Sequence, residues 1–93
     1  MGKIKSENTQ KFFEAILSLK TKEECAKFFD DVCTITELAS ISQRLEVAML
    51  LKDKLTFNEI VAKTGASTAT ISRVNRCLQY GDGGYDTVLK RIK

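Results

Sequence analysis

Apolar residues recur along most of the chain at the three- and four-residue spacing of amphipathic helices, separated by short polar stretches. The absence of proline and the low number of glycines, five, suit a mostly helical chain. We therefore predict an all-α fold of about six helices. The expected helices cover roughly residues 6–19, 22–32, 35–52, 57–63, 68–78 and 85–92.

Ser or Thr stands directly before four of these segments. Thr21, Thr34 and Thr56 are each followed three residues later by Glu, which is the capping-box pattern, and Ser67 precedes the fifth segment without a Glu. In a capping box the hydroxyl accepts a free backbone N–H at the helix start, and the Glu accepts the N–H of the cap residue. The boxes therefore predict where three of the helices begin.

No repeat, low-complexity stretch or long linker divides the sequence, so a single domain over residues 1–93 is expected. Each part of that domain has an expected role. The parts are two dimerisation helices (1–33), a long central helix (34–54), a helix-turn-helix (56–79) and a C-terminal helix (84–92).

Two pairs of adjacent phenylalanines, Phe12-Phe13 and Phe28-Phe29, widen the apolar arcs of the first two helices. Neighbouring residues on a helix point about 100° apart, so such an arc needs partners on more than one side. An intertwined homodimer would supply these partners. Ordinary packing within one chain is the alternative.

Composition excludes several classes of function. Histidine is absent and no CxxC occurs, which leaves too few ligands for a zinc site and no base for a Ser–His or Cys–His nucleophile. We therefore expect no catalytic residue, no metal and no enzyme activity. The cysteines, Cys25, Cys33 and Cys77, are expected to be buried small apolar residues rather than a disulfide framework.

Two further absences bear on location. No apolar run approaches the ~20 residues that a membrane span needs, so no membrane association is expected. The first ten residues, MGKIKSENTQ, lack the apolar stretch of a secretion signal. The cytoplasm is the expected location.

The positive charge is concentrated in the second half of the chain. Of a net charge of +3, the whole excess falls in residues 55–93, which carry six basic and three acidic groups. No acidic residue occurs from Ile60 to Gly81, whereas Lys63, Arg73 and Arg76 do. Such a stretch indicates a surface for an anion, most often nucleic acid, although three basic groups over this length also arise by chance.

The same stretch has the layout of a helix-turn-helix. Gly65 lies where a tight turn needs positive φ, and Ser67 can cap the second helix. Four apolar residues are expected to pack the two helices together: Ile60, Val61, Ile71 and Val74. In this design the second helix enters the major groove of double-stranded DNA.

Small and basic side chains make up the outward positions of this motif. Small hydroxyls and alanine allow close approach to base edges, and Lys or Arg can reach phosphates or guanine. The predicted DNA-binding residues are Asn58, Lys63, Ser67, Thr68, Ala69, Thr70, Ser72, Arg73 and Arg76.

The segment from Gly65 to Val74 resembles the turn and recognition helix of bacterial repressors. The wider stretch from Thr34 to Leu78 resembles the Trp repressor superfamily. It is most similar to the YerC/YecD group of Trp-repressor-like proteins, in Gln43-Arg44-Leu45, in the block Ala69–Arg73 and in the ending Gly81–Tyr85. The resemblance implies an all-helical homodimer that binds operator DNA and regulates transcription, with repression as the expected direction.

The resemblance also implies an effector pocket. The Trp repressor holds tryptophan between two arginines, which correspond here to Arg44 and Arg73. This chain has Val74 where the repressor has glycine, and Cys77 where it has serine. We therefore expect no cofactor and no need for tryptophan in DNA binding.

Two questions stay open at the level of the sequence. Val74 either fills the tryptophan pocket or points into the core and leaves it open, and the two arginines could hold the carboxylate of another small molecule. The alternative function is a protein-interaction module that keeps the fold without binding DNA.

Overall fold

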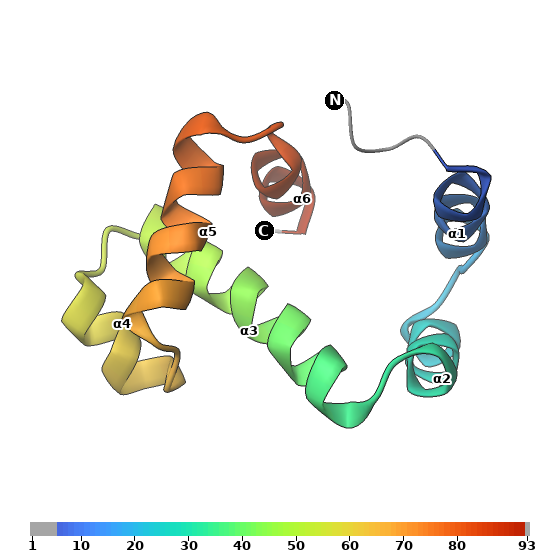
Figure 1. Ribbon diagram of the computed structural model, residues 1–93, viewed down its shortest axis with the longest axis horizontal. Helices are drawn as coiled ribbons and strands as arrows, with labels where there is room; N and C mark the ends of the chain where they lie inside the picture. The colour runs from blue at the N-terminus through green and yellow to red at the C-terminus, as the bar shows by residue number, and fades with distance from the viewer. Residues whose placement is uncertain (1–5, 93) are drawn as a thin grey trace. The chain divides into compact units, whose positions relative to one another are not determined.

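The structure, a computed structural model, describes residues 6–92, and all regular structure within them is helical (Figure 1). This confirms the predicted all-α class. The helices are α1 (Glu7–Leu17), α2 (Lys22–Val32), α3 (Ile35–Lys52), α4 (Phe57–Thr64), α5 (Thr68–Tyr80) and α6 (Gly84–Ile92).

Local side-chain hydrogen bonds fix the helix starts, as predicted. At α4 the Thr56 hydroxyl accepts the Glu59 N–H at 3.2 Å, and the Glu59 carboxylate accepts the Thr56 N–H at 2.8 Å. Thr34 and Glu37 form the same reciprocal pair before α3. Ser67 caps α5 by accepting the N–H of Thr70 at 3.1 Å.

The capping box predicted at Thr21 is only half formed. The Thr21 hydroxyl accepts the Glu24 N–H at 3.0 Å, but the Glu24 carboxylate accepts the N–H of Lys20 at 2.8 Å instead of that of the cap residue. The backbone at Thr21 is more extended than at Thr56, with φ of −133° against −76°. The N–H one residue earlier therefore reaches the carboxylate.

The chain divides into two compact units, Met1–Leu38 and Ala39–Lys93. In the described part of the first unit, α1 and α2 meet through three aromatic rings. Phe12 stacks on Phe28 with ring centroids 5.9 Å apart, and Phe29 stands edge-on to both. Neither helix buries any side chain fully, and Leu17 is 84% exposed.

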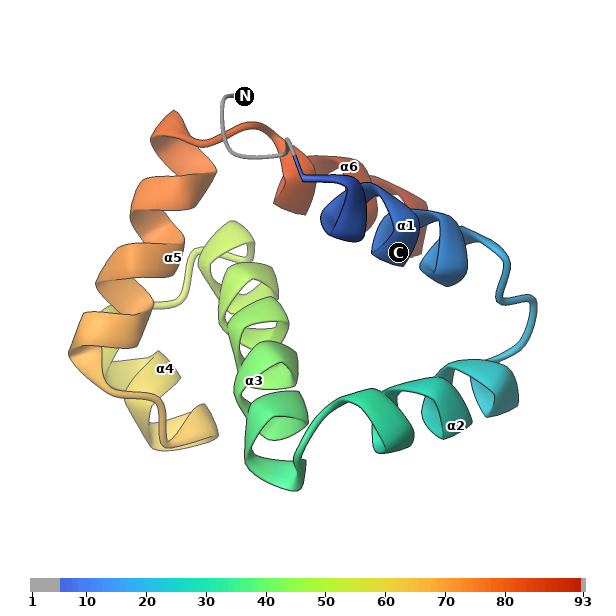
Figure 2. The same cartoon turned by 45° about the vertical axis from the view of Figure 1, so that its right-hand side comes forward.

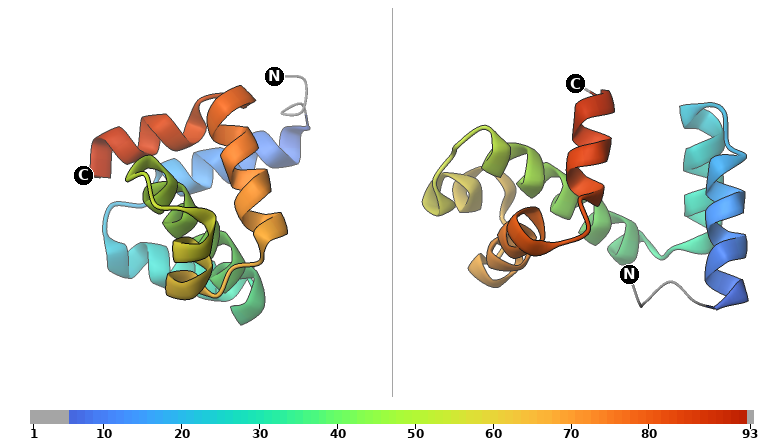
Figure 3. Two further views of the ribbon diagram at one scale, coloured as in Figure 1. Left: turned by 90° about the vertical axis from the view of Figure 1, so that its left-hand side faces the viewer. Right: turned by 90° about the horizontal axis from the view of Figure 1, so that it is seen from above.

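The second unit has a small aliphatic core. Its α4 and α5 pack around the C-terminal half of α3, and α6 leaves α5 at a sharp bend (Figures 2 and 3). Side chains from all four helices and from the turn after α4 form the core. The buried residues are Val47, Ala48, Ile60, Ala66, Ile71, Val74 and Leu89.

The bend between α5 and α6 depends on glycine. Gly81 ends α5, and its N–H donates to the Cys77 carbonyl at 2.9 Å. A Cβ placed on Gly81 would lie 2.5 Å from that carbonyl oxygen, whereas a Cβ on Gly84 would meet nothing within 4 Å. A side chain at position 81 would therefore clash with the backbone of α5, whereas position 84 has room for one.

We predict that Gly81→Ala lowers the free energy of unfolding by about 1–3 kcal/mol, because the backbone must move to relieve the contact. Gly84→Ala is the matched control, and it should be neutral or stabilising by up to about 1 kcal/mol because Gly84 begins α6. Urea unfolding of both variants measures the difference. Equal stabilities would contradict the geometry at Gly81.

Candidate nucleic-acid interface

The turn between α4 and α5 is closed by hydrogen bonds on both sides of Gly65. Gly65 has φ of 74°, and its N–H donates to the Val61 carbonyl at 2.9 Å. The Thr64 hydroxyl donates to the Ile60 carbonyl at 2.8 Å and accepts the Ala66 N–H at 3.0 Å. Ala66 itself is buried, so the turn forms part of the core.

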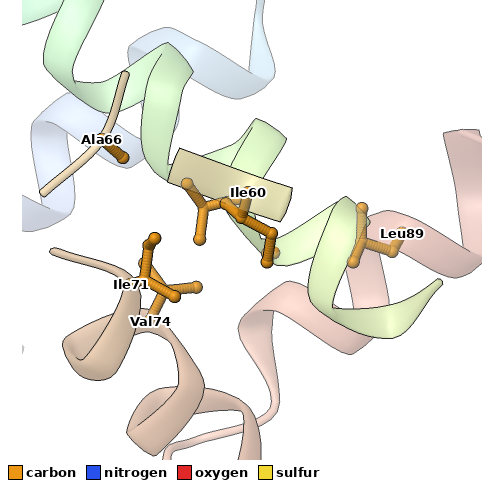
Figure 4. Packing of buried hydrophobic residues seen from close by; sticks show 7 residues of the cluster. Ile60, Ala66, Ile71, Val74 and Leu89 are labelled. Atoms are coloured by element: carbon orange, nitrogen blue, oxygen red, sulfur yellow. The ribbon is translucent and has the colours of Figure 1, made fainter. Parts of the chain in front are cut away.

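Three branched side chains hold α5 against α4. Ile71 and Val74 on α5 point toward Ile60 on α4, and each is at most 1% exposed (Figure 4). The prediction that Val61 shares this role was wrong, since Val61 is 36% exposed. Ile60 and Val61 point about 100° apart on a short helix, and here Ile60 faces the core while Val61 faces solvent.

This packing leaves the opposite side of α5 open to solvent. Thr68, Ala69, Ser72, Arg73 and Arg76 are all exposed there. Four of them, with Cys77, line a shallow surface hollow: Ala69, Ser72, Arg73 and Arg76. The structure thus brings the predicted residues of α5 onto one accessible face.

The remaining predicted residues lie on α4 and at the start of α5. Asn58 and Lys63 are exposed on α4, and Ser67 is exposed at the start of α5. Thr70 is half-buried, and its hydroxyl lies 3.1 Å from that of Ser67, so it supports the cap.

The three basic groups of the helix-turn-helix form no salt bridge with the described residues. From Ile60 to Gly81 the sequence has no acidic residue. Among residues 6–92, the salt bridges join Lys11 to Glu14 and Lys52 to Asp86, and neither involves a basic group of the helix-turn-helix. The charges of Lys63, Arg73 and Arg76 are therefore available to an anion.

The candidate effector residues are placed differently from one another. Arg73 lines the hollow on α5, whereas Arg44 is exposed on α3 and does not line it. Of the two placements left open for Val74, the structure shows the second, because the side chain points into the core. Val74 therefore does not block the hollow beside Arg73.

The expectation that the cysteines are buried was wrong. Cys25 is exposed on α2, and Cys33 and Cys77 are half-buried. Cys25 lies on α2, which buries none of its side chains fully. Cys77 lines the surface hollow on α5.

The sequence also left one residue of this region without a role. Gln43 on α3 donates from its side-chain amide to the Thr64 carbonyl at 3.2 Å. The available signal was its position four residues before Val47, on the core-facing side of α3.

Comparison with known proteins places this geometry in a family. Residues 7–93 match the family described as Trp repressor protein. The chain is 53% identical over 93 residues to YerC of Bacillus subtilis (strain 168), in a match that covers 100% of this chain and 89% of YerC. The chain belongs to the Trp repressor family.

Solved structures of the family share its fold. A crystal structure of a TrpR-like protein from Eubacterium eligens is 54% identical, with a TM-score of 0.94 over 99% of this chain and 95% of the other. A crystal structure from Staphylococcus aureus is 48% identical, with a TM-score of 0.92 over 97% and 90% of the two chains. Members of the Trp repressor family are regulatory proteins rather than enzymes. Within residues 6–92, no helix has the length and apolarity that crossing a bilayer requires.

Proposed function

We propose that this chain is a sequence-specific DNA-binding transcriptional regulator that acts in the cytoplasm as a homodimer and represses the genes it controls. The observation that supports DNA binding most directly is the exposed, acid-free face of α5, which the core packing of Ile71 and Val74 turns toward solvent. Membership of the Trp repressor family supports the same function.

The exposed face divides into two kinds of contact. Lys63 and Arg76 have the long cationic side chains that suit phosphates and position the protein without reading sequence. Thr68 and Ala69 at the start of α5 are small enough to meet base edges in the major groove. In a homodimer the two recognition helices would read half-sites about 34 Å apart, one helical turn of DNA.

Sequence selection and salt dependence test whether the protein binds DNA. The wild-type protein should select a preferred duplex from a random pool. With three basic side chains per protomer and two protomers, log K should fall against log salt with a slope of about −5. A protein-interaction module would select no duplex, and its partner affinity would barely respond to salt.

Variants of the face should separate the two kinds of contact. Lys63→Ala and Arg76→Ala should weaken binding to selected and random duplexes alike and make the salt slope shallower, by about one for each phosphate that the variant no longer neutralises. Substitution of Thr68 or Ala69 should instead change which sequence is selected. Unchanged binding after joint replacement of Thr68, Ala69, Arg73 and Arg76 would show that α5 is not the recognition helix.

The homodimer is supported by apolar side chains that one chain leaves uncovered. Leu17 and Ile35 are 84% and 90% exposed, and the aromatic cluster of α1 and α2 has no fully buried member. A second copy of the chain would cover apolar groups of this kind.

We therefore predict a dimer by light scattering at micromolar concentration. Phe28→Ala should lower the free energy of unfolding by roughly 3–5 kcal/mol, the usual cost of truncating a Phe that the dimer buries. Lys27→Ala, an exposed neighbour on α2, is the control and should change stability by about 0.5 kcal/mol or less. A stable monomer would refute the dimer.

The proposal also includes DNA binding without tryptophan. Val74 points into the core and leaves the hollow beside Arg73 unobstructed, so it does not exclude tryptophan sterically. The support for binding without tryptophan comes from the core, because the buried side chains of Ile71 and Val74 hold α5 against α4.

We predict that saturating L-tryptophan changes the affinity for the selected duplex by less than about twofold. Calorimetric titration of the protein with the amino acid, beside DNA titrations with and without it, measures both effects. Micromolar tryptophan affinity, or marked tightening on DNA, would contradict this part of the proposal.

A further inference from the structure

A hydrogen bond from the long central helix reaches the turn of the helix-turn-helix. The Gln43 side-chain amide on α3 donates to the carbonyl of Thr64, the last residue of α4, at 3.2 Å. The helix caps join residues three positions apart, but this bond joins residues 21 apart. It therefore links two elements that local structure alone does not hold together.

Thr64 is the residue on which the turn depends. Its carbonyl belongs to the last turn of α4, where no later N–H of the helix is available to donate to it. Its hydroxyl bonds both the Ile60 carbonyl and the Ala66 N–H. Gln43 therefore bonds Thr64, the same residue whose hydroxyl holds the chain in its turn through Gly65 into α5.

Gln43 lies on the side of α3 that packs against the helix-turn-helix. Gln43 precedes buried Val47 by four residues, so both lie on the same side of the helix. The core at Val47 and Ala48 holds α3 against the helix-turn-helix, and the amide fixes the end of α4 beside it. A hydrogen bond adds a directional constraint to the apolar packing at this point.

We infer that Gln43 is a positioning residue for DNA recognition: it sets the angle at which the turn delivers α5 to the major groove. The inference rests on the proposed function. Without the amide, α5 remains helical and capped, but fewer molecules hold it in the arrangement that reads base edges. Contacts to phosphate depend less on that angle than contacts to bases do.

The test compares affinity for two duplexes. One is the duplex selected by the wild-type protein from a random pool, and the other is a random duplex of equal length. Gln43→Met keeps the length of the side chain and removes the donor, and Gln43→Glu keeps the shape and replaces the donor by an acceptor. Gln10→Met, at an exposed glutamine of α1, is the matched control.

Both Gln43 variants should lose about threefold to tenfold in the ratio of selected to random affinity, the scale of one hydrogen bond. For Gln43→Met, random-duplex affinity and salt slope should stay within about twofold of wild type, and Gln10→Met should keep the full ratio. All measurements are made well below each variant's melting temperature, so a loss of stability alone does not move the ratio.

Three results would overturn the inference. An unchanged ratio in Gln43→Met would show that the bond does not position α5. Equal loss of both affinities would show a general effect on binding, and unfolding of both variants would make Gln43 a purely structural residue. Failure of the wild-type protein to select any duplex would instead refute the proposed function.

Discussion

The packing of Ile60 against Ile71 and Val74 is the contact on which the candidate interface depends. These side chains are branched and fully buried, and they come from the two helices on either side of a three-residue turn. Branched side chains have few rotamers, so their interlock fixes the rotation of α5 about its own axis. That rotation decides which residues of α5 meet solvent. The exposure of Arg73 and Arg76 on α5 is thus a consequence of an apolar contact on the opposite side of the same helix.

The sequence predicted most of this arrangement because its signals are local. A hydroxyl and a carboxylate three residues apart mark a helix start whatever surrounds them, and Thr34 and Thr56 formed the expected boxes. The exposed positions of α5 followed from helical period and from the turn at Gly65. Each of these inferences needed only neighbours within about four residues.

The predictions that were wrong, or missing, concern choices made by tertiary contacts. Val61 and Ile60 are both apolar, and the placement of α3 and α5 decides which of them is buried. Cysteine is a residue type that is often buried, but Cys25 lies on α2, which buries no side chain fully. Gln43 is an ordinary polar residue until the end of α4 is brought within 3.2 Å of its amide. The helical period places Gln43 on the core-facing side of α3, but only the fold shows that its partner is the Thr64 carbonyl.

The capping bonds that begin these helices also bear on how quickly the protein forms. They close between residues three positions apart, so each helix can nucleate before distant parts of the chain meet. The chain has no proline, which removes the slow isomerisation that delays many folding reactions. For a regulator that works as the proposed dimer, the slow step left is the encounter of two chains, whose rate rises with their concentration. The delay between synthesis and active regulator would then be set by expression level, and the first copies made in a cell would wait longest.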